Sequence, residues 1–235
     1  MTLILLPNLL EESLSHEFFL PISVGHAVRS LQGIIAESEK SARRFVRRFL
    51  SHDEMAALPI RLLNEHTQAT EFARLIEPLQ RGETWGILSD AGLPCLADPG
   101  ADIVALAKQH GIEVEALVGP CSLVLSLQLS GLPSQKFAFH GYLPREMPDL
   151  QTHLKELEKR SRVEGATQLF IEAPYRSAKL LETLLGTLQP TTRLCVAASL
   201  TTPEQRVVTQ TIANWKAGKA SLQLGKEPAV FLFRA

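Results

Sequence analysis

Short runs of leucine, isoleucine and valine recur along this chain, with amphipathic stretches between them. This alternation is typical of an α/β protein with a mainly parallel sheet, because a parallel strand needs a helical crossover before the next one. In the first half we expect strands at Thr2–Leu6, Gly33–Glu37, Ile60–Asn64, Thr84–Ser89 and Val114–Val118, and helices at Ser38–Leu50, Thr67–Arg81 and Ala101–His110.

The second half opens with "GPCSLVLSLQLSGLP", which indicates a small-residue turn, an apolar helix and a stop. Late strands follow one another without a helix between them, so we expect hairpin pairing and a mixed sheet. The expected strands are Phe137–Gly141, Gln168–Glu172, Arg193–Ala198, Arg206–Thr211 and Val230–Phe233, and the expected helices are Asp149–Arg162 and Tyr175–Leu188. The sequence therefore predicts two α/β domains, residues 1–118 and 119–235.

Composition narrows the classes of protein that this chain belongs to. With 24 basic and 25 acidic residues, the balance argues against massive nonspecific binding of nucleic acid, but it leaves room for a local basic patch. No apolar run reaches the roughly 18 residues of a membrane helix, and the first ten residues lack the features of a signal peptide. The 3 cysteines and 7 histidines show no metal-ligand spacing, so we expect no metal and a reducing, cytoplasmic location.

The segment "GILSDAGLPCLADPG", from Gly86 to Gly100, leaves an expected strand and enters an irregular loop. In open α/β sheets, ligands bind beyond the carboxyl ends of strands. Gly92 allows a close backbone approach to a ligand, and two prolines stiffen the loop. Asp90 and Asp98 are equally consistent with simple turn-capping roles. The chain has no GxGxxG or GxxxxGK[ST] motif to support an ordinary dinucleotide or nucleoside triphosphate site.

"SDAGLPCLADPG", "VGPCSLVLSLQLSGLP", "FAFHGYLP" and "LFIEAPYR" follow one another in an order that resembles the tetrapyrrole methylase superfamily. Within it the chain is most similar to the branch, ribosomal RNA small subunit methyltransferase I, that methylates a ribose 2′-hydroxyl and shows SDAGTPxxSDPG, PGPSA, SGLP, GFLP and ESPHR. The resemblance covers Leu31 to the C-terminus. It implies two α/β domains with S-adenosylmethionine (SAM) in the cleft between them, usually in a homodimer.

The resemblance also implies which residues bind the cofactor. Carried over position by position, they are Pro7, Ser89, Asp90, Ala91, Gly92, Leu93, Leu96, Cys121, Ser122, Glu172 and Leu200.

The chain departs from the family pattern in its first half. Where the family has "TPIGNLED", this chain has "LLPNLLEE", which keeps Pro7 without a glycine nearby. The lysine that tends to follow GFLP is replaced by Arg145 and Glu146. These changes support membership of a subgroup rather than identity with a ribosomal enzyme.

Several residues are candidates for contact with the substrate. Arg43, Arg44 and Arg47 lie on one expected helix, where they form either a cationic face for RNA phosphates or an ordinary amphipathic surface. Tyr175 and Arg176 follow "EAP" and contact either cofactor or substrate, or simply start a helix. We interpret His140 as a packed strand residue rather than a base.

Methyl transfer from a sulfonium needs alignment of donor and acceptor, and a ribose hydroxyl needs a general base as well. Asp90, Glu37 and Glu172 are candidates for that base, and no sequence feature selects among them. The leading hypothesis is a SAM-dependent RNA methyltransferase. The alternatives are a methylase of a tetrapyrrole or another small molecule, and a SAM-binding protein that has lost catalysis.

Overall fold

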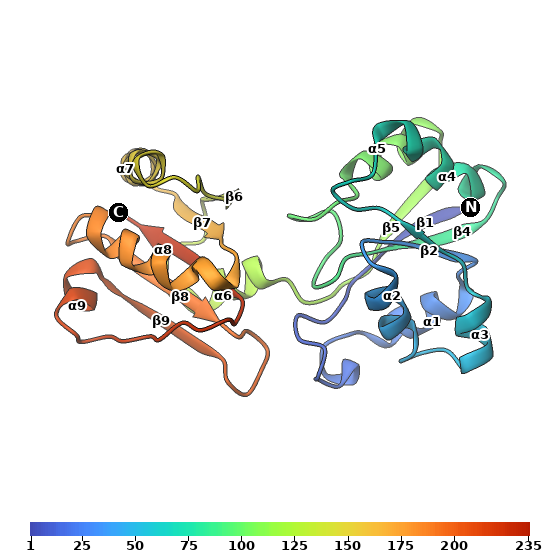
Figure 1. Cartoon of the computed structure of the whole chain (residues 1–235), viewed down its shortest axis with the longest axis horizontal. Coiled ribbons are helices and arrows are strands. Elements are labelled where there is room, and N and C mark those ends of the chain that lie inside the picture. The colour runs from blue at the N-terminus through green and yellow to red at the C-terminus, as the bar shows by residue number, and fades with distance from the viewer. The chain divides into compact units, whose positions relative to one another are not determined.

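The computed structural model describes all residues, 1–235, and the chain divides into two compact units, Met1–Cys121 and Ser122–Ala235. Each unit contains one five-stranded sheet with helices on both faces (Figure 1). The predicted α/β class, with a parallel sheet followed by a mixed one, is confirmed.

The sheet of the first unit is entirely parallel, with strand order β3-β2-β4-β1-β5. Its strands are β1 (Thr2–Leu6), β2 (Gly33–Ala36), β3 (Ile60–Leu62), β4 (Thr84–Leu88) and β5 (Glu113–Ala116). Its helices are α1 (Ile22–Ser30), α2 (Glu39–Val46), α3 (His52–Ala57), α4 (Phe72–Gln80) and α5 (Ala101–Gln109), with short 3₁₀ turns η1 (His16–Phe18) and η2 (Ala69–Glu71).

Successive strand residues of this sheet point to opposite faces, and each face has its own core. Ile34 and Leu88 pack with α1 and α2, whereas Ile35 and Ile87 pack with α4 and α5. Because both faces are buried, the strands are continuous apolar runs rather than alternating ones.

The second unit has a mixed sheet of order β6-β7-β10-β8-β9. Its strands are β6 (Phe137–Tyr142), β7 (Thr167–Ile171), β8 (Arg193–Ala198), β9 (Arg206–Thr211) and β10 (Ala229–Arg234). Its helices are α6 (Ser122–Ser130), α7 (Met147–Glu164), α8 (Pro174–Thr187) and α9 (Ile212–Lys216). β8 and β9 form the expected antiparallel pair.

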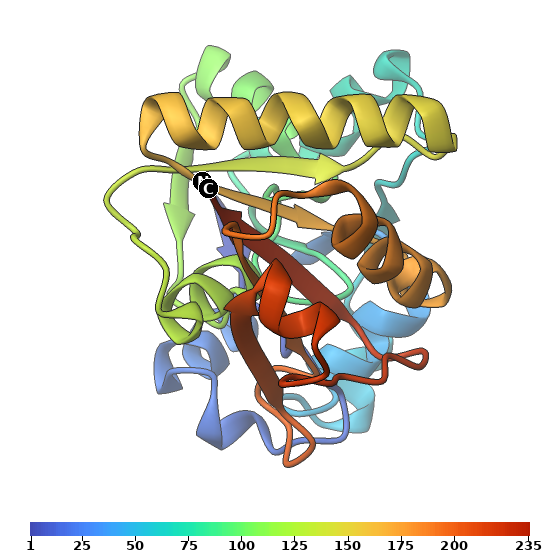
Figure 2. The same cartoon turned by 90° about the vertical axis from the view of Figure 1, so that its left-hand side faces the viewer.

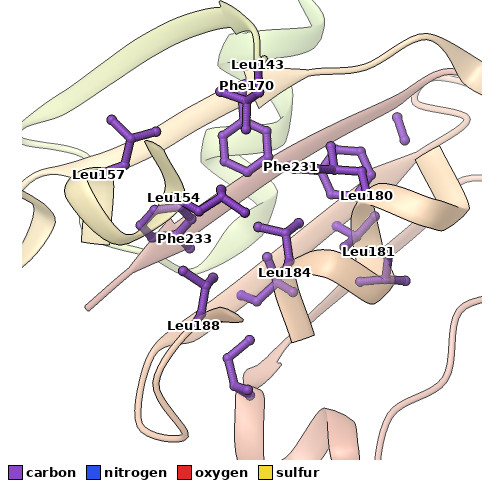
Figure 3. Close-up of a cluster of buried hydrophobic side chains, with 14 of the residues drawn as sticks. Leu143, Leu154, Leu157, Phe170, Leu180, Leu181, Leu184, Leu188, Phe231 and Phe233 are labelled. Carbon is purple, nitrogen blue, oxygen red and sulfur yellow. The ribbon is translucent and has the colours of Figure 1, made fainter. Parts of the chain in front are cut away.

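The larger core of the second unit lies between the sheet and helices α7, α8 and α9, which cover the face seen in Figure 2. Figure 3 shows this core, where Phe170, Phe231 and Leu184 are fully buried. The Phe170 and Phe231 rings stack with centroids 5.9 Å apart. The opposite face is covered by α6 around Leu127 and Leu169.

Some expected boundaries were wrong. The predicted helix Thr67–Arg81 is instead the turn η2 followed by α4, and the strands expected to reach Glu37, Asn64 and Val118 end earlier. Helices α1, α3 and α9 were not predicted.

Candidate functional site

Three neighbouring strands of the first unit end at the same level of the sheet. Leu88 of β4 is in register with Leu6 of β1 on one side and with Ala36 of β2 on the other. The chain segments that follow these strands therefore meet at the carboxyl edge of a parallel sheet, where open α/β sheets bind ligands. These segments contain Pro7, Glu37 and the loop that starts at Ser89.

Asn8 connects two of these segments. Its side-chain Nδ2 donates to the carbonyl oxygens of Ser89 and Asp90, both at 3.0 Å, and its backbone N–H donates to the Gly92 carbonyl at 2.8 Å. The side-chain oxygen accepts from the Leu9 N–H at 2.8 Å. Sequence reasoning missed this buried residue. The available signal was an asparagine directly after Pro7 at a strand end.

Pro7 is held on its other side by Gly119. A Cβ built on Gly119 would lie only 2.0 Å from the Cβ of Pro7. Any side chain at position 119 would therefore push the two segments apart. The glycine that the family places beside this proline is absent here, yet a glycine approaches it from the segment after β5.

Three carboxylates gather at this edge. The Asp90 N–H donates to Glu37 Oε1 at 3.3 Å, and the Ser38 hydroxyl donates to Asp90 Oδ1 at the same distance. Burial raises the pKa of Glu37, and the nearby charge of Asp98 raises it further. Burial also raises the pKa of Asp98, with a smaller contribution from Asp90.

No ion pair of the structure includes Glu37, Asp90 or Asp98. The edge therefore carries uncompensated negative charge and suits a cationic ligand. We call Glu37, Asp90 and Asp98 the carboxylate cluster.

Ser89 lies within this cluster and is 1% exposed. Its hydroxyl lies close enough to Glu37 and Asp98 to lower the pKa of both, but it makes no hydrogen bond of normal geometry. A buried hydroxyl without a partner costs free energy, so such a group is a candidate for binding a ligand.

The loop after Ser89 has an unusual backbone. Gly92, Cys95, Ala97 and Gly100 have positive φ angles of 71°, 67°, 68° and 134°. Non-glycine residues with positive φ are uncommon and cluster at functional sites. A Cβ on Gly92 would lie 3.3 Å from Leu10 Cδ2 and 3.6 Å from the Pro120 carbonyl oxygen. Two strained non-glycine residues in one loop, Cys95 and Ala97, indicate that the loop is part of a functional site rather than a simple connection.

The remaining candidates of the first unit lie at or near this edge. Ala91 is exposed, Leu93 is half-buried and Leu96 is 42% exposed in the loop itself. Cys121 is buried and is the last residue of the unit. Ser122 is the first residue of α6 in the second unit.

Glu172 lies at the corresponding edge of the second sheet, directly after β7. Its buried carboxylate pairs with Arg176 (Nη2 to Oε2, 3.2 Å) and also accepts from the Ala173 N–H at 2.8 Å. Tyr175, in the first turn of α8, is 73% exposed.

Leu200 lies at this same edge, after β8, and is buried. Its neighbours Ser199 and Thr201 have positive φ angles of 52° and 71°. A β-branched residue such as threonine is a clear outlier in this region. Each unit therefore has a strained loop at the carboxyl edge of its sheet.

The arginines of α2 are largely engaged within the protein. Arg43 donates to the carbonyl oxygens of Met55 (2.5 Å) and Leu58 (2.9 Å), and Arg44 pairs with Glu12. Arg47 has no such partner. As substrate-binding residues the three remain predictions, and the contacts of Arg43 and Arg44 favour a structural role.

His140 contacts Gln168, with 2.7 Å between Nε2 and Oε1, and burial lowers its pKa. This contact fits the packed role expected for it. No group of three or more His, Cys, Asp or Glu residues is arranged to hold a metal ion, and no helix is long and apolar enough to cross a membrane.

Comparison with known proteins identifies the family. Residues 26–215 match the family described as Tetrapyrrole (Corrin/Porphyrin) Methylases. The chain belongs to this family. It is therefore a methyltransferase of the SAM-dependent kind, as its motifs predicted.

Curated relatives agree with this membership. The chain is 30% identical to the ribosomal RNA small subunit methyltransferase I of Pseudomonas aeruginosa, over 85% of the chain and 70% of the relative. It is 35% identical to the protein of that name from Xylella fastidiosa, over 80% of the chain and 66% of the relative. With the Vibrio cholerae protein it shares 34% identity, over 59% of the chain and 47% of the relative. The chain thus spans about half to 70% of the length of these relatives.

Solved structures support the fold. The methyltransferase CobJ superposes with a TM-score of 0.62 at 16% identity, covering 99% of this chain and 92% of that one. The uroporphyrin-III-C-methyltransferase of Thermus thermophilus superposes with a TM-score of 0.55 at 18% identity, covering 99% of this chain and 91% of that one.

The residues at the first-unit edge fit the cofactor of the family. SAM carries a sulfonium and an ammonium group, and the carboxylate cluster offers negative charge without a protein cation. The unpartnered Ser89 hydroxyl offers a hydrogen-bonding group. Backbone groups of the loop around Gly92 are brought to the same edge by Asn8.

Proposed function

We propose that this chain transfers a methyl group from SAM to a ribose 2′-hydroxyl of small-subunit ribosomal RNA. The observation that carries the proposal is the 30–35% identity to relatives named ribosomal RNA small subunit methyltransferase I. The carboxylate cluster supports the donor part of the proposal. A cytoplasmic location follows from the substrate and remains part of the proposal.

We propose that the loop from Ser89 to Leu96, together with Pro7, Cys121, Ser122, Glu172 and Leu200, binds the donor. When bound, SAM supplies an activated methyl group on a positively charged sulfur. Asp90 and Asp98 would stabilise that charge, because neither carboxylate is neutralised by a lysine or arginine. Rigid loops lower the entropy cost of aligning donor and acceptor.

Among the three candidates for the general base, the contacts favour Glu37. Glu172 is already paired with Arg176, and Asp90 accepts a hydrogen bond from Ser38. Glu37 accepts from a backbone N–H at 3.3 Å, and burial, together with the charge of Asp98, raises its pKa, which makes the carboxylate a stronger base. A Glu37→Gln variant keeps Asp90 and Asp98 of the cluster, so it should lose methyl transfer to a much greater extent than SAM affinity.

The second candidate function is methylation of a tetrapyrrole, which the description of the matching family favours. Purified protein with tritiated SAM separates the two acceptors. We expect label in 16S ribosomal RNA from a strain lacking the gene and none in RNA from its parent, where the site is already methylated. Label in a porphyrinogen and none in either RNA would favour the alternative. Binding of SAM without transfer to any acceptor would indicate a protein that has lost catalysis.

We also propose that the protein is a homodimer, as the family resemblance implies. The exposed apolar residues Val124 and Leu129 on α6 are consistent with it, since such side chains can be covered at an interface between two copies. Sedimentation equilibrium at micromolar concentration tests it, and the mass of a single chain would contradict it.

A further inference from the structure

The chain has only 2 tyrosines, and both are on the surface of the second unit. Tyr142 is 65% exposed and Tyr175 is 73% exposed. Both tryptophans, in contrast, are buried. Neither tyrosine ring packs against another aromatic ring or an arginine. Two large aromatic surfaces are therefore free.

These two tyrosines lie at one edge of the sheet. Tyr142 is the last residue of β6 and is in register with Ile171, the last residue of the parallel strand β7. Tyr175 follows Ile171 by four positions, in the first turn of α8. The edge is the one that carries Glu172 and the strained loop around Leu200.

The backbone around Tyr142 has a defined, irregular geometry. The register of β6 against β7 shifts between Phe139 and Tyr142, where Gly141 has a φ of +63°, and Leu143 is buried immediately afterwards. A rigid aromatic side chain loses little conformational entropy on binding.

The backbone position of Tyr175 is set by the start of helix α8. Pro174 is the first helical residue, and the ion pair between Glu172 and Arg176 spans the turn. The exposed cations nearest in sequence are Arg145, three residues after Tyr142, and Lys179, four residues after Tyr175. Exposed aromatic rings on a surface segment that also carries exposed cations suit a nucleotide, with its flat base and charged phosphate.

We propose that Tyr142 and Tyr175 form a stacking platform for unpaired bases of the RNA acceptor. The proposal rests on the proposed RNA methyltransferase function and assigns the acceptor a single-stranded segment. Bases of a regular duplex are already stacked, so only unpaired ones can lie on these rings.

The test uses the full chain and a fluorescein-labelled single-stranded oligoribonucleotide, with fluorescence anisotropy as readout. Tyr142→Ala and Tyr175→Ala should each weaken RNA binding about tenfold. Tyr142→Phe and Tyr175→Phe, which keep the rings, should bind like the wild type. Phe137→Ala, which removes an exposed aromatic from the other end of β6, should also have no effect.

An abasic oligoribonucleotide of the same length separates stacking from phosphate binding. It should bind more weakly than the normal strand, and the alanine variants should not weaken it further. SAM affinity, measured by calorimetry, should be unchanged in every variant. Alanine variants that bind RNA normally, or that lose SAM affinity, would overturn the platform. Wild-type protein that binds SAM but no RNA would overturn both the platform and the proposed acceptor.

Discussion

Replacing Asn8 with alanine should destabilise the first unit far more than a surface asparagine would. The substitution removes three side-chain hydrogen bonds, two of 3.0 Å to the carbonyl groups of Ser89 and Asp90 and one of 2.8 Å from the Leu9 N–H, and leaves these groups without that partner. A net hydrogen bond contributes about 1 kcal/mol, and an unsatisfied buried group costs about 1–3 kcal/mol. We therefore expect the free energy of unfolding to fall by about 2–4 kcal/mol. In a unit of this size, each kcal/mol lowers Tm by about 4 °C.

The two tryptophans allow this effect to be assigned to one unit. Trp85 lies in β4 of the first unit, and Trp215 lies in α9 of the second. In a Trp215→Phe background, tryptophan fluorescence during urea unfolding reports the first unit alone. Asn64→Ala is the matched control, because Asn64 also follows a parallel strand but bonds only an exposed turn N–H, that of His66.

Asn64→Ala should lower the free energy of unfolding by less than about 1 kcal/mol, as surface substitutions usually do. If Asn8→Ala and Asn64→Ala unfold at the same urea concentration, Asn8 does not hold the two strand-end segments together. The reasoning about the candidate site would then be wrong at its first step. SAM affinity should fall along with stability, since the loop loses its attachment.

Gly92→Val should abolish SAM binding, measured by calorimetry. It should also lower the free energy of unfolding by about 1–2 kcal/mol, because a branched residue is strained at a φ of +71°. The control variant Lys159→Ala should bind SAM normally. Normal SAM binding by Gly92→Val would make the loop a simple turn. Folding raises the pKa of Asp98, so the folded protein favours the protonated carboxyl group. Asp98 therefore contributes stability below about pH 4, and this contribution is lost as the pH rises through the pKa of the folded state. Asp98→Asn should thus unfold at higher urea than wild type at pH 7, with the difference shrinking toward pH 4; a less stable variant at pH 7 would contradict this. Arg176→Met should destabilise the second unit by about 2–4 kcal/mol, because the buried Glu172 carboxylate loses its cation and keeps only the hydrogen bond from the Ala173 N–H. Adding Glu172→Gln should restore most of this loss.

Much of the fold follows from the sequence because the strands are continuous apolar runs. The predicted bounds of β1, β8 and β9 agree with the structure residue for residue. Helix α3 was missed although its signal was present, because Ser51 and Glu54 form a capping box in front of a weakly apolar stretch. Helix α1 has Gly25 and His26 in its middle, and it is stabilised by packing of Val24 and Val28 that no local pattern reveals.

The candidate site was only partly predictable. The loop of Asp90 and Gly92 was readable because turn residues directly follow a buried strand. The role of Asn8 was not readable, because its partners are about eighty residues away along the chain and are brought to it only by the pairing of β1 with β4. The isolation of the carboxylate cluster from every cation likewise depends on where side chains fold, not on composition.

The position of β1 in its sheet has a consequence for how the protein is made. Strand β1 precedes the other four strands of its unit in the chain, yet it lies between β4 and β5, with Thr2 in register with Thr84 and Glu113. Strand β1 has no partner until β4 has been synthesised, and the sheet is complete only after β5, so β1 stays unpaired during most of the unit's translation. An apolar strand in that condition is a natural client for a chaperone. Removing Thr2–Leu6 would therefore take away the strand that joins β5 to the rest of the sheet, rather than one of its edge strands.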